Sequence, residues 1–250
     1  MSEFHIIDVS KWQGDIDWEH VRASGIDGAM LRAGYGAGNI DPKFVRNAKE
    51  CTRLGIPFGV YWFSYAWTPM QAEDEAKYCL GAIAPYRITL PVAFDWEYDS
   101  YNRAVREGVT PTRALAVSMA KRFLSTVEQA GYVPMLYTNL DYQNQFFPPE
   151  ELAGYDRWIA AYRATRPDTP LAMWQYTSRG RVDGIDGLVD CNRLYIDYPA
   201  IAEEREKTPD YAELVCEKLG LAGETREYLD GYRYAADLWR KIWEGLNKFS

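Results

Sequence analysis

The stretch Pro91-Val92-Ala93-Phe94-Asp95-Trp96-Glu97 decides the fold, because a short apolar run ends in two carboxylates one residue apart. An apolar run of this length is typical of a buried strand. Residues i and i+2 of a strand face the same way, roughly 6.6 Å apart along the backbone. We therefore expect Asp95 and Glu97 to share one face, with Trp96 turned away. Such a pair suits glycosidic bond cleavage, while a solvated strand end is the alternative interpretation.

The same pattern of strand, loop and helix recurs on both sides of this stretch. We expect strands at residues 4–9, 28–33, 58–65, 91–97 and 133–138. Helices are expected at 18–24, from the Asp41-Pro42 pair to Gly55, from Thr68-Pro69 to about 84, and from Thr110-Pro111 to Gly131, with a partly helical segment over 139–155. A capping residue, a proline in the first turn and a glycine after the end are typical helix boundaries.

The pattern changes after residue 155. Three short strands are expected at 157–162, 171–177 and 187–191, without full helices between them, because the connections contain Pro167, Pro170, Gly180 and Gly184. Alternating strands and helices predict a parallel sheet with right-handed crossovers, and about eight strands in this length predict closure. The expected fold is α/β, an irregular TIM-like (β/α) barrel with five βα units and three short final strands.

The expected barrel brings polar side chains to one mouth, because the carboxyl ends of parallel strands meet there. These side chains are Asp8, Arg32, Tyr65, Asp95, Glu97, Tyr137, Tyr176 and Asp190. Carboxylates gathered in one mouth repel each other, so at least one of them should hold a proton near neutral pH.

Composition narrows the classes of partner. The 250-residue chain is 47% hydrophobic and has a net charge of −8, so we expect neither nucleic acid nor a membrane as a partner. The four cysteines are widely spaced and accompanied by two histidines, which suits neither zinc nor a disulfide framework; we expect reduced, mostly buried thiols. No basic and apolar leader precedes the first strand, so we expect synthesis in the cytoplasm without a recognisable signal peptide.

The composition becomes charged and helical after Tyr198-Pro199, so we divide the chain into a barrel at 1–199 and a helical appendage at 200–250. Thr208-Pro209-Asp210 is expected to start a helix with one apolar stripe, and a short middle helix is expected at 224–230. A second stripe follows at three-four spacing, made of Ala235, Leu238, Trp239, Ile242, Trp243 and Leu246. Wall attachment, a homo-oligomer formed through these helices, and packing on the barrel are all open roles for the appendage.

Eight stretches between residues 4 and 197 resemble, in order, the signature stretches of the Chalaropsis-type lysozymes, glycoside hydrolase family 25. They are Asp8 to Gly14, Leu31 to Gly36, Gly59 to Tyr65, Phe94 to Glu97, Tyr137 to Asn139, Trp158 to Tyr162, Trp174 to Thr177 and Val189 to Asn192. The resemblance implies an irregular (β/α) barrel that hydrolyses the β-1,4 bond between N-acetylmuramic acid and N-acetylglucosamine in bacterial peptidoglycan. Many members of the family are phage endolysins or bacterial autolysins, which act on the cell wall after release.

Carried over by position, the resemblance implies that Glu97 is the catalytic acid and Asp95 its partner. Asp8 and Asp190 are the two further acids of the site, although both could instead orient loops. The resemblance also implies a retaining reaction in which the substrate's acetamido group attacks the anomeric carbon. The residues alone do not decide between this route and direct attack by Asp95. We expect no cofactor and no metal, although an acidic cluster could in principle bind magnesium or calcium.

Substrate contacts are expected from aromatic and polar side chains near the acids. Tyr61 and Phe63 could stack on sugar rings or belong to the barrel core, and Arg32 could position a carboxylate, bind the lactyl group of muramic acid or form a structural ion pair. Tyr137, Trp174, Tyr176 and Asn192 complete the expected contacts, and Cys191 is expected to point away from the site.

Two other functions compete with the muramidase. A chitinase-like hydrolase would carry the pattern D-x-x-D-x-D-x-E, but here Ala93 occupies the place of an inner aspartate and Thr89 or Leu90 lies upstream. A non-catalytic glycan-binding barrel would be expected to have lost one of the acids, and all four are present. The appendage adds a weaker resemblance, because its stretches at 223–226 and 231–234 are similar to small helical wall-binding modules of endolysins.

Overall fold

The computed structural model describes residues 3–207, 210–230 and 235–248. The chain divides into two compact units, Met1–Pro199 and Ala200–Ser250, and the division falls where the composition changes. Each unit is described here by itself.

The first unit is built on one closed sheet. Its strands are β1 (Phe4–Val9), β2 (Gly28–Tyr35), β3 (Asn39–Ile40), β4 (Phe58–Phe63), β5 (Val92–Asp95), β6 (Pro134–Asn139), β7 (Asp156–Ala160), β8 (Met173–Gly180) and β9 (Val189–Leu194). The order is β1-β9-β8-β7-β6-β5-β4-β2-β3, and a parallel pairing of β1 with β2 closes eight of the strands into a barrel. The short β3 pairs only with the end of β2. The expected irregular (β/α) barrel is therefore confirmed.

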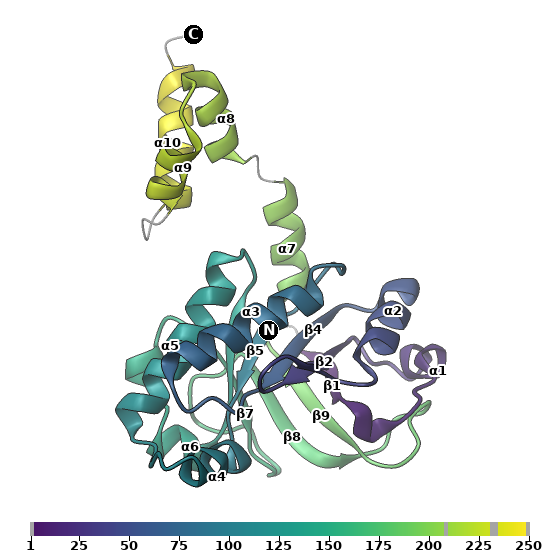
Figure 1. The fold of residues 1–250 in the computed structure, drawn as a ribbon. Coiled ribbons are helices and arrows are strands. Elements are labelled where there is room, and N and C mark those ends of the chain that lie inside the picture. The colour runs from purple at the N-terminus through teal and green to yellow at the C-terminus, as the bar shows by residue number, and fades with distance from the viewer. Residues whose placement is uncertain (1–2, 208–209, 231–234, 249–250) are drawn as a thin grey trace. The chain divides into compact units, whose positions relative to one another are not determined.

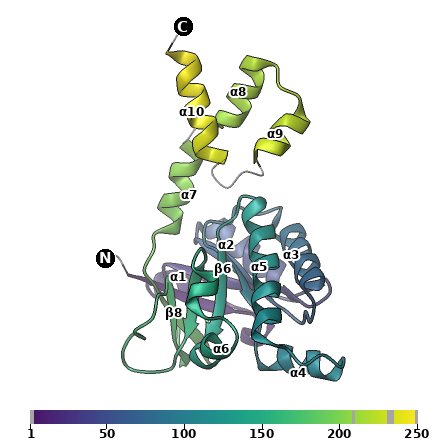
Figure 2. The ribbon, with the colours of Figure 1, turned by 90° about the vertical axis from the view of Figure 1, so that its left-hand side faces the viewer.

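Helices follow the first five barrel strands, as expected, but two helices follow β5 where one was predicted (Figure 1). They are α1 (Trp18–Ala23), α2 (Phe44–Leu54), α3 (Pro69–Ile83), α4 (Tyr98–Arg106), α5 (Arg113–Gln129) and α6 (Leu140–Gln145), with 3-10 turns at Lys11–Gln13 and Pro149–Leu152. Helices α3 and α5 lie side by side on the outside of the barrel (Figure 1 and Figure 2). Among the described residues no helix separates β7, β8 and β9. However, β8 has eight residues and is not short.

The direction of β9 differs from the expectation. This strand runs antiparallel to both of its neighbours, β1 and β8, so the sheet is mixed rather than parallel. Asp190 therefore lies near the amino end of its strand, not at the carboxyl end as expected. It still reaches the expected mouth, because an antiparallel strand presents its amino end where its neighbours present their carboxyl ends.

The start of α2 was also predicted wrongly. The helix begins at Phe44, and Asp41 does not cap it. The Asp41 carboxylate is buried and accepts hydrogen bonds from the Arg32 side chain and from the backbone N–H groups of Lys11 and Lys43. Asp41 therefore joins the ends of β1 and β2, a role that outweighs its local preference for capping a helix. The cap of α5 likewise shifts from Thr110 to Thr112.

Alternation along the strands separates two apolar layers. Inward side chains form a small cluster at one end of the barrel, with Ile6, Met30, Ala93, Met135 and Met173 among its members. Outward side chains pack under the helices, where Trp18, Trp62 and Trp96 are fully buried. The next inward position along each strand, two residues later, is polar and lines a pocket. The inward apolar cluster therefore fills one end of the barrel, and the polar mouth lies directly above it.

The C-terminal unit is helical. It contains α7 (Tyr198–Lys207), most of which lies beyond Pro199, and then α8 (Tyr211–Leu219), α9 (Gly223–Asp230) and α10 (Ala235–Asn247). A helix starts after Thr208-Pro209-Asp210 as expected, with Asp210 as its cap, whereas Thr208, Pro209 and the 231–234 stretch lie outside the described residues. Trp239 is buried against α8, and its indole N–H donates to Asp230. Much of the second apolar stripe therefore packs against other residues of this unit. Oligomerisation through this stripe stays a prediction.

No helix within the described ranges is long and apolar enough to cross a bilayer.

Candidate active site

A small pocket of about 180 Å³ opens at the carboxyl ends of the parallel strands. The four predicted acids all line it, and so do four of the predicted contact residues. Its walls are Asp8, Ser10, Trp12, Gln13, Arg32, Tyr61, Phe63, Asp95, Glu97, Tyr137, Trp158, Gln175 and Asp190. We call this cavity the acid pocket.

Asp95 and Glu97 are held by the residue between them. Strand β5 ends at Asp95, but Glu97 keeps an extended backbone (φ −127°, ψ −165°) and forms the N-cap of α4. Asp95 and Glu97 therefore face the same side, as predicted for residues i and i+2 of a strand, although the strand itself ends at Asp95. Trp96 faces outward as expected, is fully buried, and donates from its indole N–H to the carbonyl of Ala66 at 3.0 Å. This anchor fixes the backbone from which both carboxyl groups project.

Asp8 is held by two amides. One of its carboxylate oxygens, Oδ2, accepts from the Gln175 side chain at 3.0 Å and from the Asn192 side chain at 2.8 Å. Asn192 accepts from the indole N–H of Trp158, and Gln175 accepts from the hydroxyls of Tyr137 and Tyr162. An indole N–H can only donate, so the amide of Asn192 must turn its N–H group toward Asp8.

Asp190 lies directly across the sheet from Asp8, as its paired residue in β9. Burial raises the pKa of Asp8 well above its ordinary value, and the nearby charge of Asp190 raises it further. Burial also raises the pKa of Asp190. With Oδ2 of Asp8 occupied by two N–H donors, its other oxygen is the one available to share a proton with Asp190.

Asp95 and Glu97 form a second pair of acids. The pKa of Asp95 is raised well above its ordinary value, first by burial and then by Glu97. Burial likewise raises the pKa of Glu97, against the opposing hydrogen bonds of Asp95 and Tyr137. Oδ1 of Asp95 is buried without a hydrogen-bond partner among the described residues. An unpartnered buried carboxyl oxygen costs free energy, and a bound substrate could supply the missing donor.

Arg32 forms a structural ion pair within the described structure. Its Nε lies 2.7 Å and its terminal nitrogen 2.6 Å from one carboxylate oxygen of Asp41. The side chain still lines the acid pocket, and its charge lowers the pKa of Asp95 slightly, against the larger effect of burial. A contact of Arg32 with the lactyl group stays a prediction.

Aromatic rings surround the acids. Tyr61 and Tyr137 each make an edge contact with Trp158, at centroid distances of 6.0 and 4.6 Å, so these three rings form one wall. Trp12 lies at the rim and is 75% exposed, which is unusual for a tryptophan. An exposed indole beside a polar pocket offers a flat apolar surface to a sugar ring.

Three predicted contact residues do not reach the acid pocket. Trp174 and Tyr176 face outward from β8, where Trp174 donates to the carbonyl of Ala161 and Tyr176 lies against Arg193. The residue between them, Gln175, faces inward, because side chains alternate along a strand. Asn192 is 1% exposed and lies behind Asp8, so a direct contact with substrate would require it to leave its three hydrogen-bond partners.

Sequence reasoning missed several residues of the site. Three of them are Gln175, Trp158 and Trp12, which line the acid pocket. All three lie within the stretches that carry the family resemblance, but other residues of those stretches were predicted to contact the substrate. The pairing of β8 with β9 places Gln175 opposite Asn192, on the same side of the sheet. The register between β8 and β9 cannot be predicted from one sequence. The sequence does show an amide side chain in each of the two stretches, Gln175 in one and Asn192 in the other.

No group of three or more histidine, cysteine, aspartate or glutamate side chains in the described ranges is arranged to hold a metal ion. The cysteines are free. Cys51, Cys79 and Cys191 are buried, and Cys191 points away from the site, as predicted.

A closed βα barrel whose mouth gathers buried carboxyl groups in pairs has the groups that a glycoside hydrolase needs. Comparison with known families agrees with this class. The model of the glycosyl hydrolases family 25 matches residues 7–185, and the chain therefore belongs to that family of lysozyme-type glycoside hydrolases.

Individual relatives cover the same region. The protein YegX of Escherichia coli K12, described as uncharacterized, is 30% identical over 200 residues, which are 75% of this chain and 68% of YegX. Lysozyme M1 of Streptomyces globisporus is 27% identical over 75% of this chain and 66% of its own length. The structure of the modular autolysin LytC of Streptococcus pneumoniae aligns with a TM-score of 0.68 and 31% identity, over 77% of this chain and 47% of the LytC chain.

Proposed function

We propose that this chain is an N-acetylmuramidase that hydrolyses the β-1,4 bond between N-acetylmuramic acid and N-acetylglucosamine in bacterial peptidoglycan. Membership of family 25 and the relative named lysozyme M1 support this proposal. The solved structure of LytC in complex with a synthetic peptidoglycan ligand supports peptidoglycan as the substrate.

One observation carries the proposal: Asp95 and Glu97 lie at the barrel mouth with raised pKa values and face the same pocket. A general acid must arrive protonated near the working pH, and two buried carboxyl groups side by side cannot easily both be ionised there. The proposed reaction places the shared proton on Glu97 and the negative charge on Asp95, whose ionised form the nearby Arg32 favours. In the proposed reaction Glu97 donates its proton to the glycosidic oxygen as the bond to the anomeric carbon breaks.

Asp95 is proposed to stabilise the intermediate. The substrate's acetamido oxygen bonds to the anomeric carbon, and the positive charge that develops on this group lies against the Asp95 carboxylate. Water then attacks the anomeric carbon and gives a proton to Glu97, which restores the acid and the acetamido group. This route retains the configuration at the anomeric carbon. Asp8 and Asp190 are proposed to maintain the geometry and the negative charge of the acid pocket around Asp95 and Glu97.

Proton NMR of the first-formed product tests the mechanism. A β-anomer appearing before mutarotation is expected, since two displacements at one carbon retain its configuration. An α-anomer formed first would exclude the acetamido route and point to a single displacement by water.

Two competing functions predict different products. A chitinase-like hydrolase should release more reducing ends from chitin than from purified cell walls, and a glycan-binding barrel should release none from either. The muramidase should act on walls and lose that activity in Glu97→Gln.

We also propose a role in cell wall lysis of the endolysin or autolysin kind, with the protein made in the cytoplasm and acting on the wall after release. This role follows from the proposed substrate, because peptidoglycan lies outside the cytoplasm. Lysis of susceptible cells after addition from outside, measured by turbidity and compared with Glu97→Gln, tests this role.

A further inference from the structure

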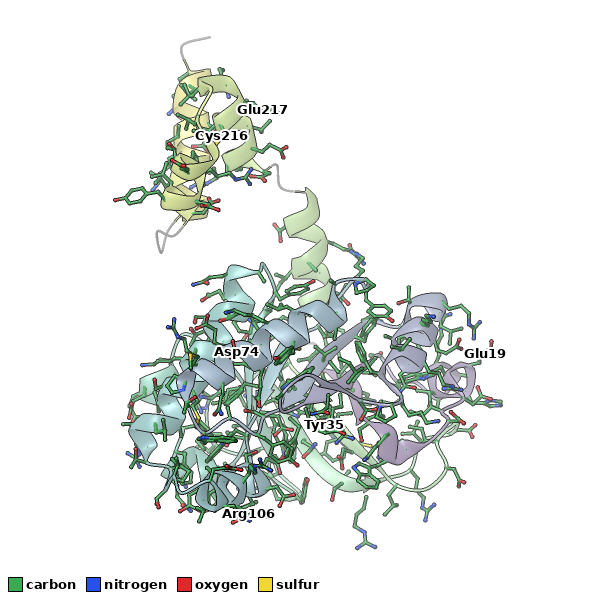
Figure 3. All side chains as sticks on the ribbon, viewed as in Figure 1. Glu19, Tyr35, Asp74, Arg106, Cys216 and Glu217 are labelled. Carbon is green, nitrogen blue, oxygen red and sulfur yellow. The ribbon has the colours of Figure 1, made fainter. Side chains whose placement is uncertain are left out.

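A second and larger cavity, of about 640 Å³, lies beside the acid pocket. Its walls come from the turn between β2 and β3, the segment that follows β4, and helices α3 and α4 (Figure 3). Figure 3 labels one residue from each of three walls: Tyr35 at the end of β2, Asp74 on α3 and Arg106 on α4. Ligand pockets in proteins commonly have volumes of about 300–1,000 Å³. We call it the side pocket.

The two pockets share their dividing wall. Phe63 lines the acid pocket and makes an edge contact, at a centroid distance of 5.2 Å, with Tyr65, which lines the side pocket. The Arg32 guanidinium of the acid pocket lies 5.8 Å from the ring centroid of Tyr35 in the side pocket. Helix α4 begins directly after Glu97. Asp99, two residues after Glu97, already lines the side pocket, so α4 connects the two cavities.

Backbone packing holds the aromatic rings of the side pocket in place. Gly36 and Gly38 have positive φ values, +54° and +79°, and lie so close to the rings of Tyr65 and Tyr78 that a Cβ would meet them at 3.1 and 3.3 Å. The backbone N–H of Tyr65 donates to Oε1 of Glu75 at 3.0 Å. The other oxygen, Oε2, of this buried glutamate has no hydrogen-bond partner among the described residues. The cavity is thus preformed and retains an unused buried acceptor.

Both signs of charge face the side pocket. Arg106 makes no ion pair with any residue that the structure describes, and Arg103 lies over the Trp67 ring at 5.7 Å while pairing with Glu107. Asp74 and Asp99 line the same cavity and are exposed. Guanidinium groups bind carboxylates through two parallel hydrogen bonds, and exposed carboxylates bind ammonium groups.

This combination of charges identifies the ligand. N-acetylated sugar rings are uncharged, so they can hydrogen-bond to these arginines and aspartates but cannot form ion pairs with them. The peptide attached to muramic acid carries free carboxylates and, in many walls, a free amine. We propose that the side pocket binds this stem peptide, with Arg106 and Arg103 on its carboxylates, while the attached sugar lies in the acid pocket. The inference rests on the proposed function and names a further part of its substrate.

A binding experiment tests the side pocket without any hydrolysis. The probe is the synthetic peptide lactoyl-L-Ala-D-Glu-L-Lys-D-Ala, titrated into the full-length protein and followed by NMR or calorimetry. We expect saturable binding that weakens about tenfold in Arg106→Gln, the loss typical of one charge-assisted hydrogen-bonded pair. Arg106→Lys should lose less, because it keeps the charge but not the paired geometry. Arg22→Gln, which removes a charge from exposed α1, is the matched control and should bind as the wild type does.

Circular dichroism confirms that each variant is folded, and the double variant of Arg103 and Arg106 should show the largest loss. Absence of binding to the wild type, or equal binding by all variants, would overturn the proposal. So would a chitotetraose titration that depends on Arg106 as strongly as the peptide does, since that marks a sugar subsite. Peptide binding without wall hydrolysis would reject the muramidase alone, and hydrolysis without peptide binding would reject the side pocket alone.

Discussion

At the scale of single residues, the site depends on which side chains hold the acids. Asp8 is oriented by Gln175 and Asn192, and the amide of Asn192 is fixed by the indole of Trp158, which can only donate. Asp95 and Glu97 are instead fixed through the backbone, by the buried Trp96. One pair of acids is therefore held by hydrogen bonds and the other by packing.

The first prediction concerns Glu97. Replacing it with Gln should lower turnover by about 10²–10⁴-fold, because the proton donor is lost. The unfolding temperature should stay the same or rise, since the change removes an acid from a crowded, buried group. Release of reducing ends and thermal unfolding measure the two effects. Glu128→Gln on the exposed face of α5 is the matched control, and near-normal turnover in Glu97→Gln would exclude it as the acid.

A second prediction concerns the buried Glu75, whose pKa burial raises from 4.5 to about 7. Because the folded state holds this proton more tightly than the unfolded chain, its stabilising contribution is complete below pH 4.5. It is lost as the pH rises through about 7. Between about pH 4 and 8 the unfolding free energy of the wild type should fall by roughly 3 kcal/mol more than that of Glu75→Gln. Denaturant unfolding at several pH values measures this difference, and parallel curves for the two proteins would contradict the assignment.

At the scale of elements, the sequence predicted most strands and helices of the barrel, because capping residues and apolar alternation act locally. Thr68 caps the helix at which it was expected. One error arose where a distant partner decided the outcome: Asp41 was predicted to cap a helix, but its carboxylate pairs with Arg32 on another element. A second error was local, because Ser100 accepts a hydrogen bond from the Glu97 N–H, which ends the strand early and starts α4.

The direction of β9 shows the same limit. Its residues suit a strand of either direction, and only its pairing with β1 and β8 makes it antiparallel. Asp190 was therefore predicted correctly to lie in the barrel mouth, but on the wrong assumption that it ends a parallel strand. Trp174 and Tyr176 were chosen over Gln175 because aromatic side chains suit sugars, whereas the register that turns Gln175 inward depends on neighbouring strands.

A third prediction compares two glycines in different elements. Gly59 lies in β4, and an added Cβ would come within 2.4 Å of the carbonyl oxygen of Pro91. Gly59→Ala should therefore destabilise the protein by about 1–3 kcal/mol or more. Gly81 lies in α3 with open space around it, so Gly81→Ala should stabilise by roughly 0.5–1 kcal/mol. Denaturant unfolding measures both, and shifts of the same sign would contradict this account of the packing.

At the scale of the whole molecule, every wall of the acid pocket and of the side pocket comes from the first unit. Tyr198 belongs to that unit as well, because it is buried and its hydroxyl donates to Asp156 at 2.7 Å. Tyr198 is also the first residue of α7, and a cut directly after Pro199 would leave this buried residue next to the new chain end. The boundary of a shortened chain should therefore lie beyond α7.

A fourth prediction follows for a chain ending at residue 207. Its turnover of soluble glycan fragments should match that of the full chain within about twofold, since independent parts contribute additively. Wall pull-down and sedimentation then separate the proposed roles of the appendage. Weaker wall binding by the truncated chain would indicate that the appendage attaches the protein to the wall. A smaller oligomer would indicate that the appendage mediates oligomerisation. No change in either measurement would leave packing on the barrel as its role. Loss of turnover in a folded truncated chain would contradict the division into units.

The most direct test of the central claim is the identity of the new reducing end. Purified peptidoglycan is digested, the products are reduced with borohydride, and the terminal sugar alcohol is identified by mass spectrometry. A muramidase leaves N-acetylmuramic acid at the reducing end, so muramitol is the expected product, and it should be absent after digestion with Glu97→Gln. Glucosaminitol in place of muramitol would contradict the proposed cleavage site.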